Sequence, residues 1–236
     1  MTLVLGAVDG ELSVILERMR TSATERWNGF PCARGTIGDE PVVVARVGTG
    51  KSLSAMVTQH LIDRCAPHRL IVVGMAGSLR EEVAVGDTVI ARDTLQHDVD
   101  VTALGYEPGR IPHAPARAFA CDPGLVELAR AVDPPRGRAH LGRIVSGDRF
   151  VADAGSRARL VRDYGAHAVE MEGASIGLVA VLNGLPFVVV RSISDRADGA
   201  PVDLRRQVRE TALDAWYYVE RMLAGLRTDR RDREQE

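Results

Sequence analysis

The stretch Leu-Ile-Val-Val-Gly-Met-Ala-Gly at residues 70–77 is the most informative segment for the fold. Its first four side chains are aliphatic, without the polar alternation of a strand that faces water on one side. Such continuous runs are typical of strands in a sheet that is covered on both faces. The small residues after the strand either pack closely or leave room for a flat ligand beside backbone amides.

Similar apolar runs recur along the chain and alternate with segments of helical periodicity. Six further strands are predicted at residues 3–8, 42–47, 87–91, 143–146, 168–171 and 187–193. Helices are predicted at residues 12–19, 56–61, 124–132, 156–164, 174–182 and 203–226. This order predicts a largely parallel α/β sheet in one domain, residues 1–226. The all-polar segment 227–236 is expected to be a frayed helix end or a disordered tail.

The 236-residue chain has an ordinary globular composition, with 45% hydrophobic and 26% charged residues. Its net charge of −2 gives no reason to expect a nucleic-acid or membrane partner. Cys32, Cys65 and Cys121 are scattered without metal-ligand spacing, so we expect no metal site and a reducing, cytoplasmic location. Lys51 is the only lysine, which genomic base composition explains without assigning it a role.

The segment Gly-Thr-Gly-Lys-Ser at residues 48–52 follows a predicted strand, as a phosphate-binding loop would. A Walker A motif requires a glycine where this chain has Ala45, so a nucleoside triphosphatase is disfavoured. The segment is either a plain turn or a tight turn that brings backbone close to a ligand. The long, irregular segment 94–116 is a second functional candidate, because long loops inside compact domains are often functional.

Carboxylates follow three of the predicted strands. Glu11 comes after the first strand, Glu172 lies between a buried strand and an apolar helix, and Asp195 follows the strand at 187–193. Structural explanations exist for each, namely a helix N-terminal charge or a cap, and Glu170 is best explained by an ion pair with an arginine. Ligands of α/β sheets bind beyond strand carboxyl ends, however, and glycosidic cleavage needs an acid, a base and an anionic grip on the sugar.

Seven collinear stretches resemble the 5′-methylthioadenosine/S-adenosylhomocysteine nucleosidases of the nucleoside phosphorylase superfamily. They are residues 6–15, 47–52, 73–79, 85–112, 144–151, 168–175 and 188–198, with the specific motifs SGDxF, VEMEx and RxISDxAD. The resemblance implies an α/β fold, a three-layer sandwich around a mixed, partly closed sheet. It also implies a homodimer without metal or organic cofactor that hydrolyses the N-glycosidic bond of 5′-substituted adenosines and releases adenine.

The resemblance further implies a role for each acid. Glu11 would activate water, Asp195 would protonate the purine at N7, and Glu172 would bind the ribose hydroxyls. Phe150 would stack on the base, Met171 would pack on the sugar, Val151, Ala76 and Gly77 would line the base side, and Ser194 would orient Asp195. Thr49 is a further substrate-binding candidate. The 5′ group would contact Val101, Leu104, Tyr106 and Pro112, some of them from the partner subunit.

Two alternatives differ in chemistry from hydrolysis. A phosphate-dependent phosphorylase of this superfamily would carry an arginine where this chain has Val72, and another after the first strand, where this chain has none. A non-catalytic nucleoside-binding protein would have lost at least one of the three acids. The chain also departs from the nucleosidases themselves, with Leu104 where phenylalanine is common, Thr49 where an apolar residue is usual, and Val8 where methionine is usual. These departures bear on the 5′ group that is preferred rather than on the reaction.

Overall fold

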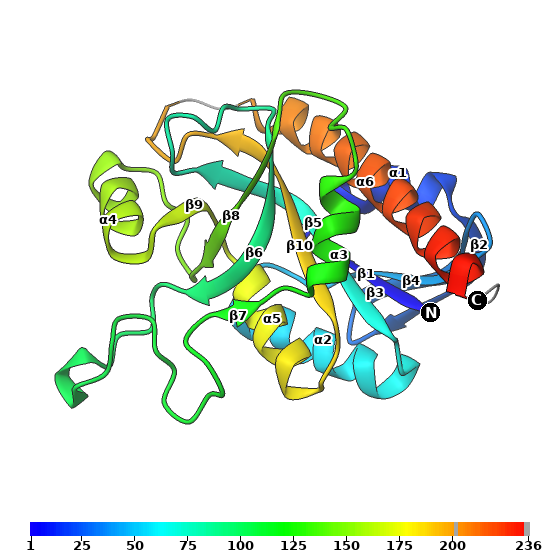
Figure 1. Cartoon of the computed structure of the whole chain (residues 1–236), viewed down its shortest axis with the longest axis horizontal. Coiled ribbons are helices and arrows are strands. Elements are labelled where there is room, and N and C mark those ends of the chain that lie inside the picture. Colours follow the sequence, from blue (N-terminus) through cyan, green and yellow to red (C-terminus); the bar gives the residue numbers. More distant parts are fainter. Residues whose placement is uncertain (201–202, 234–236) are drawn as a thin grey trace.

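Figure 1 shows the fold as a computed structural model, which describes residues 1–200 and 203–233. The described strands form one ten-stranded sheet in the order β10-β6-β8-β9-β5-β1-β4-β3-β2, with β7 paired to β6. The strands are β1 (Thr2–Gly6), β2 (Arg20–Trp27), β3 (Phe30–Ile37), β4 (Glu40–Arg46), β5 (Arg69–Ser78), β6 (Thr88–Gln96), β7 (Phe119–Ala120), β8 (Ala139–Ser146), β9 (Ala166–Glu170) and β10 (Phe187–Asp195).

One half of the sheet closes on itself. Strand β10 pairs in parallel with β5 and antiparallel with β6, so the path β10-β6-β8-β9-β5 returns to β10. The other half, β1-β4-β3-β2, extends outward from β5 as an open wing. The mixed, partly closed sheet that the resemblance implies is therefore confirmed.

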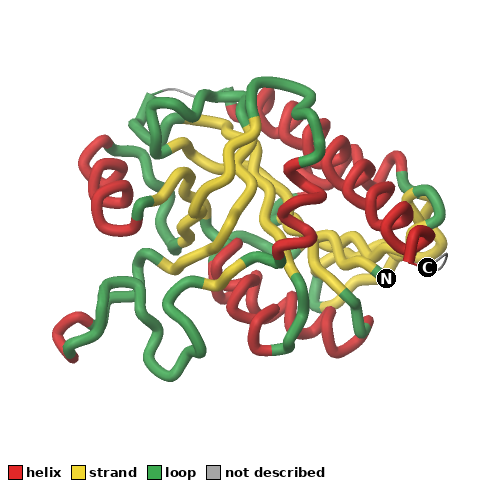
Figure 2. Tube along the Cα trace, viewed as in Figure 1, coloured by secondary structure: helices red, strands yellow, loops and turns green. Residues whose placement is uncertain are grey.

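Helices cover both faces of the sheet (Figures 1 and 2). Helices α2 and α5 contact each other on one side, and α6 contacts α1 and α3 on the other. Helix α4 packs beside β9. The bounds are α1 (Asp9–Arg18), α2 (Lys51–Cys65), α3 (Pro123–Arg130), α4 (Ala154–Tyr164), α5 (Gly173–Leu182) and α6 (Leu204–Arg233), with a short 3-10 helix η1 (Thr102–Leu104).

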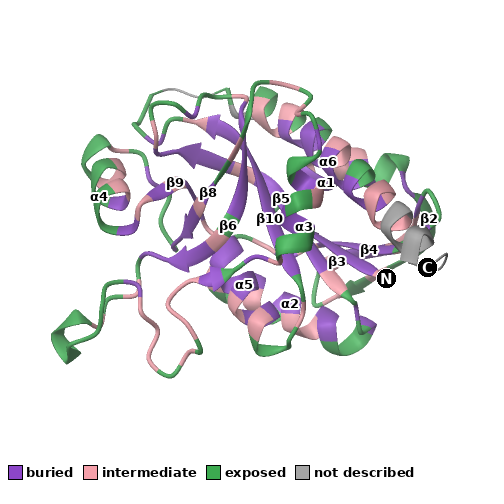
Figure 3. Cartoon of the chain, viewed as in Figure 1, coloured by how far each residue is buried: buried purple, intermediate pink, exposed green. Residues whose placement is uncertain are grey.

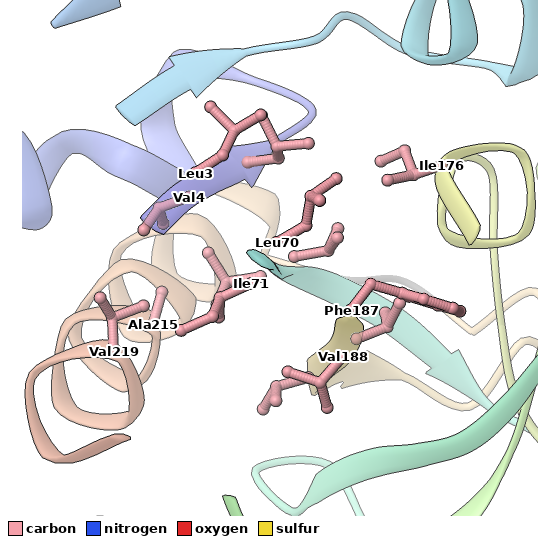
Figure 4. Close-up of a cluster of buried hydrophobic side chains, with 14 of the residues drawn as sticks. Leu3, Val4, Leu70, Ile71, Ile176, Phe187, Val188, Ala215 and Val219 are labelled. Atoms are coloured by element: carbon pink, nitrogen blue, oxygen red, sulfur yellow. The ribbon is translucent and has the colours of Figure 1, made fainter. Parts of the chain in front are cut away.

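The core lies on both faces of the central strands. Leu70 and Ile71, adjacent residues of β5, are both fully buried, so β5 has no face in contact with water. Figure 4 shows Ala215 and Val219 of α6 beside Ile71, and Figure 3 shows the central strands buried along their length. This double coverage explains why the strand sequences are continuous apolar runs.

The sheet is less parallel than the strand order predicted. The pairs β2–β3, β3–β4, β5–β9, β6–β10 and β6–β7 are antiparallel. The β2–β3 hairpin escaped prediction because β2 is a mostly exposed edge strand with the polar sequence Arg-Thr-Ser-Ala-Thr-Glu-Arg-Trp. Without a buried face, its sequence shows neither an apolar run nor a regular alternation.

Several strands are longer than predicted, and the extensions of β5 and β6 bear on the site. The small-residue segment 74–78 continues β5, because β10 and β9 both hydrogen-bond to it. Strand β6 extends to Gln96, so the irregular loop begins at His97 and not at Thr94. These extensions place residues expected in loops on the rigid sheet.

The helices agree with prediction in position but not in every face. Leu12 and Ile15 of α1 are buried as predicted, whereas Met56 of α2 is 45% exposed. Helix α6 continues through Arg233 into the segment expected to be frayed or disordered, and residues 234–236 lie outside the described residues. Within the described part of the chain, no helix has the length and apolar character to span a bilayer.

Candidate active site

A cavity of about 210 Å³ lies at the ends of β1, β5, β9 and β10. The loops after β4 and β8 complete its wall. It brings together ten residues that the sequence predicted for the site, namely Glu11, Thr49, Ala76, Gly77, Phe150, Val151, Met171, Glu172, Ser194 and Asp195. Three separate strand ends thus deliver carboxylates to one hollow, as the sequence pattern suggested.

Glu11 lies in the first turn of α1 and is 2% exposed. Its Oε2 accepts hydrogen bonds from the backbone N–H groups of Ala7 (2.8 Å) and Val8 (3.1 Å). Its Oε1 accepts a third from Met75 N at 3.0 Å, across the cavity floor in β5. Three rigid backbone donors therefore fix the carboxylate. A buried acid requires such hydrogen bonds because they replace those it would make to water.

Glu170, the last residue of β9, forms a buried ion pair with Arg191 of β10. Glu170 also accepts hydrogen bonds from Ser146 Oγ and from the backbone N–H groups of Glu172 (3.1 Å) and Gly173 (2.8 Å). The ion-pair explanation for Glu170 is confirmed. Its carboxylate is held by the ion pair as well as by hydrogen bonds, which is consistent with a structural role.

Glu172 caps the start of α5 and faces the cavity. Its Oε1 accepts from Gly50 N at 3.0 Å, and its Oε2 lies 3.5 Å from Arg191 Nη2. Glu170 and Glu172 both reach Arg191. Burial raises the pKa of Glu172 to about 7, and the nearby charge of Glu170 adds to the rise, whereas Arg191 opposes it.

Asp195 ends β10 at the opposite wall of the cavity. Ser194 Oγ donates to its Oδ2 at 2.8 Å, and Ala197 N donates to its Oδ1 at 2.8 Å. Gly77 lies against it, because an added Cβ there would come within 2.9 Å of Asp195 Oδ1. The carboxyl group is therefore fixed in direction while one side of it remains open to the cavity.

The remaining walls are mostly apolar. Ala76 and Gly77 form one side of the cavity and Val151 another, all three buried. Phe150 also lines the cavity, yet 69% of it is exposed, so its ring lies at the mouth. Apolar walls with a few convergent polar groups are typical of small-molecule sites.

Four predicted residues lie outside this cavity. Val101, Leu104, Tyr106 and Pro112 belong to the loop that follows β6, which projects away from the body of the chain (Figure 1). Leu104 is 74% exposed and Tyr106 is 39% exposed. In the single chain this loop does not close its own pocket, and the prediction that it serves a partner subunit stays a prediction.

The sequence did not reveal the groups that hold the acids in place. Arg191, buried beneath the cavity, and Gly50 N, which binds Glu172, were not identified as site groups. The only sequence signal that could have placed Arg191 at the site is its position in the same motif as Asp195. Within the described residues, no cluster of three or more His, Cys, Asp or Glu side chains is arranged to hold a metal ion.

The fold and the cavity agree with comparisons to known proteins. The family model of the phosphorylase superfamily matches residues 2–219. The chain therefore belongs to this superfamily, whose match spans the sheet and every carboxylate described above.

Individual relatives indicate which family within the superfamily the chain resembles. A 5′-methylthioadenosine/S-adenosylhomocysteine nucleosidase from Treponema pallidum is 38% identical over 256 residues, covering 95% of this chain and 94% of that protein. The nucleosidase of the same name from Neisseria meningitidis, in complex with methylthio-immucillin-A, has a TM-score of 0.88 at 33% identity, covering 94% of this chain and 97% of that one. A futalosine hydrolase of Helicobacter pylori has a TM-score of 0.85 at 29% identity, covering 95% and 97%.

Within the superfamily, the chain belongs to the 5′-methylthioadenosine/S-adenosylhomocysteine nucleosidase family. It is accordingly an enzyme of the purine nucleosidase class.

Proposed function

We propose that this enzyme hydrolyses the N-glycosidic bond of 5′-substituted adenosines, such as 5′-methylthioadenosine or S-adenosylhomocysteine, and releases adenine. The observation that carries the proposal is the arrangement of three cavity carboxylates with three different sets of partners. Glu11 is held by backbone amides of the turn between β1 and α1 and of β5, Glu172 by Gly50 N, and Asp195 by Ser194 and Ala197. Each is thereby suited to a separate part of one substrate.

Asp195 is assigned the departing base. Cleavage of the bond leaves electrons on the purine, and a proton delivered to N7 neutralises them. Ser194 Oγ and Ala197 N fix the carboxyl group at the wall formed by Ala76 and Gly77, where a flat base fits. The acid and the base plane are then held in the geometry that proton transfer needs.

Glu11 and Glu172 are assigned to the sugar side. Glu172 would accept hydrogen bonds from the ribose hydroxyls, with Met171 packed against the sugar. Glu11 would take a proton from the water that attacks the anomeric carbon as the sugar becomes oxocarbenium-like. The backbone donors that fix Glu11 leave it no freedom to rotate away from that water.

The charges around the cavity support water, rather than phosphate, as the second substrate. Arg191 is the buried cation at the floor, and Glu170 and Glu172 already surround it. Arg149 also lines the cavity, but it is paired with Asp153 and its side chain is 66% exposed. A phosphate dianion would be desolvated beside Glu11 and Glu172 without a free cation, which is strongly unfavourable.

We further propose that the enzyme is a homodimer in which the loop of one subunit completes the pocket of the other. The supporting observation is the projecting loop, with Leu104 and Tyr106 exposed although both are large and hydrophobic. Exposed apolar groups on a projecting segment are typical of an interaction surface.

A substrate panel tests the proposed reaction. Adenine release should be followed with 5′-methylthioadenosine, S-adenosylhomocysteine and adenosine, and base release with futalosine, all without phosphate. We expect the 5′-thioether nucleosides to be cleaved with the highest kcat/KM. A protein that binds these nucleosides without releasing a base would be a non-catalytic binding protein, and the proposal would be wrong.

A further inference from the structure

Lys51, the only lysine of the chain, forms an ion pair beside the cavity that the proposed reaction does not use. Its Nζ lies 2.6 Å from Asp98 Oδ1, with the two side chains only 17% and 28% exposed. Burial alone would raise the pKa of Asp98, but the hydrogen bond from Lys51, a second from Asp148 N and the charge of Lys51 hold it below its usual value. The pair is therefore charged and partly shielded from water, unlike an ordinary surface pair.

The pair belongs to a closed ring of hydrogen bonds. Asp98 Oδ2 accepts from Asp148 N at 2.9 Å, and Asp148 Oδ1 accepts from Lys51 N at 2.7 Å. Lys51 thus meets both acids, one through its side chain and one through its backbone. The ring joins the turn between β4 and α2, where Lys51 is the first residue of α2, to the loops after β6 and β8.

Close packing shows that these segments have little room to shift. A Cβ added to Gly50, which has φ +91°, would lie 2.9 Å from Asp148 Oδ1. A Cβ added to Gly147 would lie 2.4 Å from Nε2 of His97, a residue that is 6% exposed. The ring therefore connects segments that already touch.

Each of the three segments carries part of the site. Gly50, next to Lys51, donates its N–H to Glu172. Phe150, two residues after Asp148, lies at the cavity mouth. Asp98 stands at the root of the projecting loop that contains Val101 and Leu104. A displacement of Lys51 would reach all three, although Lys51 itself does not line the cavity.

We propose that Lys51 is a positioning residue, which through Asp98 and Asp148 holds the root of the projecting loop against the turns that carry Gly50 and Phe150. In the proposed homodimer it thereby sets where that loop reaches the 5′ end of the partner's pocket, relative to the ribose and base subsites there. This inference rests on the proposed function, because it assigns the 5′ group to that loop.

Kinetics of four variants test the proposal. Lys51→Met removes the charge at similar length, Lys51→Arg retains a cation, and Asp98→Asn removes the other charge. Arg130→Met is the control, because it breaks an exposed pair with Glu127 on α3. We expect Lys51→Met to raise KM for a 5′-thioether nucleoside about tenfold, as for a misplaced binding group, with kcat changed less than about threefold. The increase should be smaller for adenosine, and Lys51→Arg should restore much of the loss.

The double variant Lys51→Met/Asp98→Asn measures the coupling between Lys51 and Asp98. If the two residues act as one pair, its KM should be no higher than that of the worse single variant. The proposal would be overturned if the effects of the two single variants on KM added in the double variant. It would also be overturned if Lys51→Met had the same KM as Arg130→Met, or if Lys51→Arg were as impaired as Lys51→Met. A lower Tm with unchanged KM would assign the pair to stability alone and would also overturn it.

The single lysine allows a second, substrate-free measurement. An amine-acylating reagent can modify only Lys51 and the terminal amine, so mass spectrometry reports Lys51 against an internal reference. Asp98→Asn should increase the acylation rate of Lys51 several-fold without changing that of the terminus. Equal rates in both proteins would show that Asp98 does not hold Lys51. Because this assay needs no turnover, failure of the ion pair is distinguishable from failure of the proposed reaction.

Discussion

Asp195 is fixed by two hydrogen bonds and still open to the cavity, which is what a proton donor requires. Asp195→Asn keeps the shape and should leave the fold and KM nearly unchanged. We expect kcat to fall by about 10²–10⁴, the usual contribution of a general acid. Asp198→Asn is the matched control, because Asp198 is an exposed acid of the same segment. Steady-state adenine release measures both, and a near-normal kcat in Asp195→Asn would exclude it as the acid.

Glu172 links the site to the stability of the protein. Burial raises the pKa of Glu172 from its ordinary value to about 7, so the folded state binds a proton more tightly than the unfolded state. Its contribution to stability is therefore fully present below the unfolded pKa and is lost as pH rises through the folded pKa.

Glu172→Gln should remove this pH-dependent loss. Above about pH 7 we expect the variant to have a Tm roughly 2–8 °C higher than the wild type, and the difference should shrink as the pH falls and vanish below the ordinary pKa of a glutamate. Nucleoside binding should weaken, because a charge-assisted hydrogen bond is lost. Thermal melts across the pH range measure the first effect, with exposed Glu127→Gln as the control. Equal Tm values of the variant and the wild type at alkaline pH would contradict the raised pKa of Glu172.

At the scale of the element, β5 leaves room for Glu11 and Arg191 at the cavity floor because Gly74 has no side chain. A Cβ at Gly74 would lie 2.1 Å from Arg191 Nη1 and 2.6 Å from Glu11 Oε1, and its φ is +150°. Gly74→Ala should therefore displace Glu11, the proposed base, and the buried Arg191 together. Gly86 offers a control, because it has φ +91° but no atom within 4 Å of an added Cβ.

We expect both glycine variants to lose about 1 kcal/mol or more of stability, since a side chain at positive φ is strained. Only Gly74→Ala should lose activity, by at least about 100-fold, as expected for a displaced catalytic group. Thermal melts and kcat/KM on the same samples separate the two effects. Equal losses of activity would show that strain, and not the contact with Glu11, is responsible.

The elements also show what the sequence can and cannot predict. The buried strands and the acids at their ends were predictable, because both depend on local pattern: an apolar run, then a carboxylate. The extension of β5 through Ser78 was not, because glycines weaken the strand signal and the pairing with β9 and β10 is non-local. The partner of Glu170 was foreseen only as some arginine, since no pattern singles out Arg191 before the fold is known.

At the scale of the whole molecule, the projecting loop predicts a shared site. Leu104→Arg should damage the loop, and Asp195→Asn removes the proposed acid, so each homodimer should be inactive or nearly so. In a mixed dimer, the intact loop of one subunit would complete the pocket that retains Asp195 in the other. Co-purified mixed dimers carrying two tags should therefore regain activity. A verified mixed dimer that is no more active than its parents would show that the loop does not serve the partner.

The central claim is that water, activated in a cavity of carboxylates, takes the place of phosphate. The most direct measurement compares the rate of adenine release without phosphate and at saturating phosphate, tests for a sugar 1-phosphate by ³¹P NMR, and identifies the free sugar by mass spectrometry. We predict equal rates, free 5′-substituted ribose as the product, and no sugar 1-phosphate. Adenine release that requires phosphate, with a sugar 1-phosphate as the product, would contradict the claim.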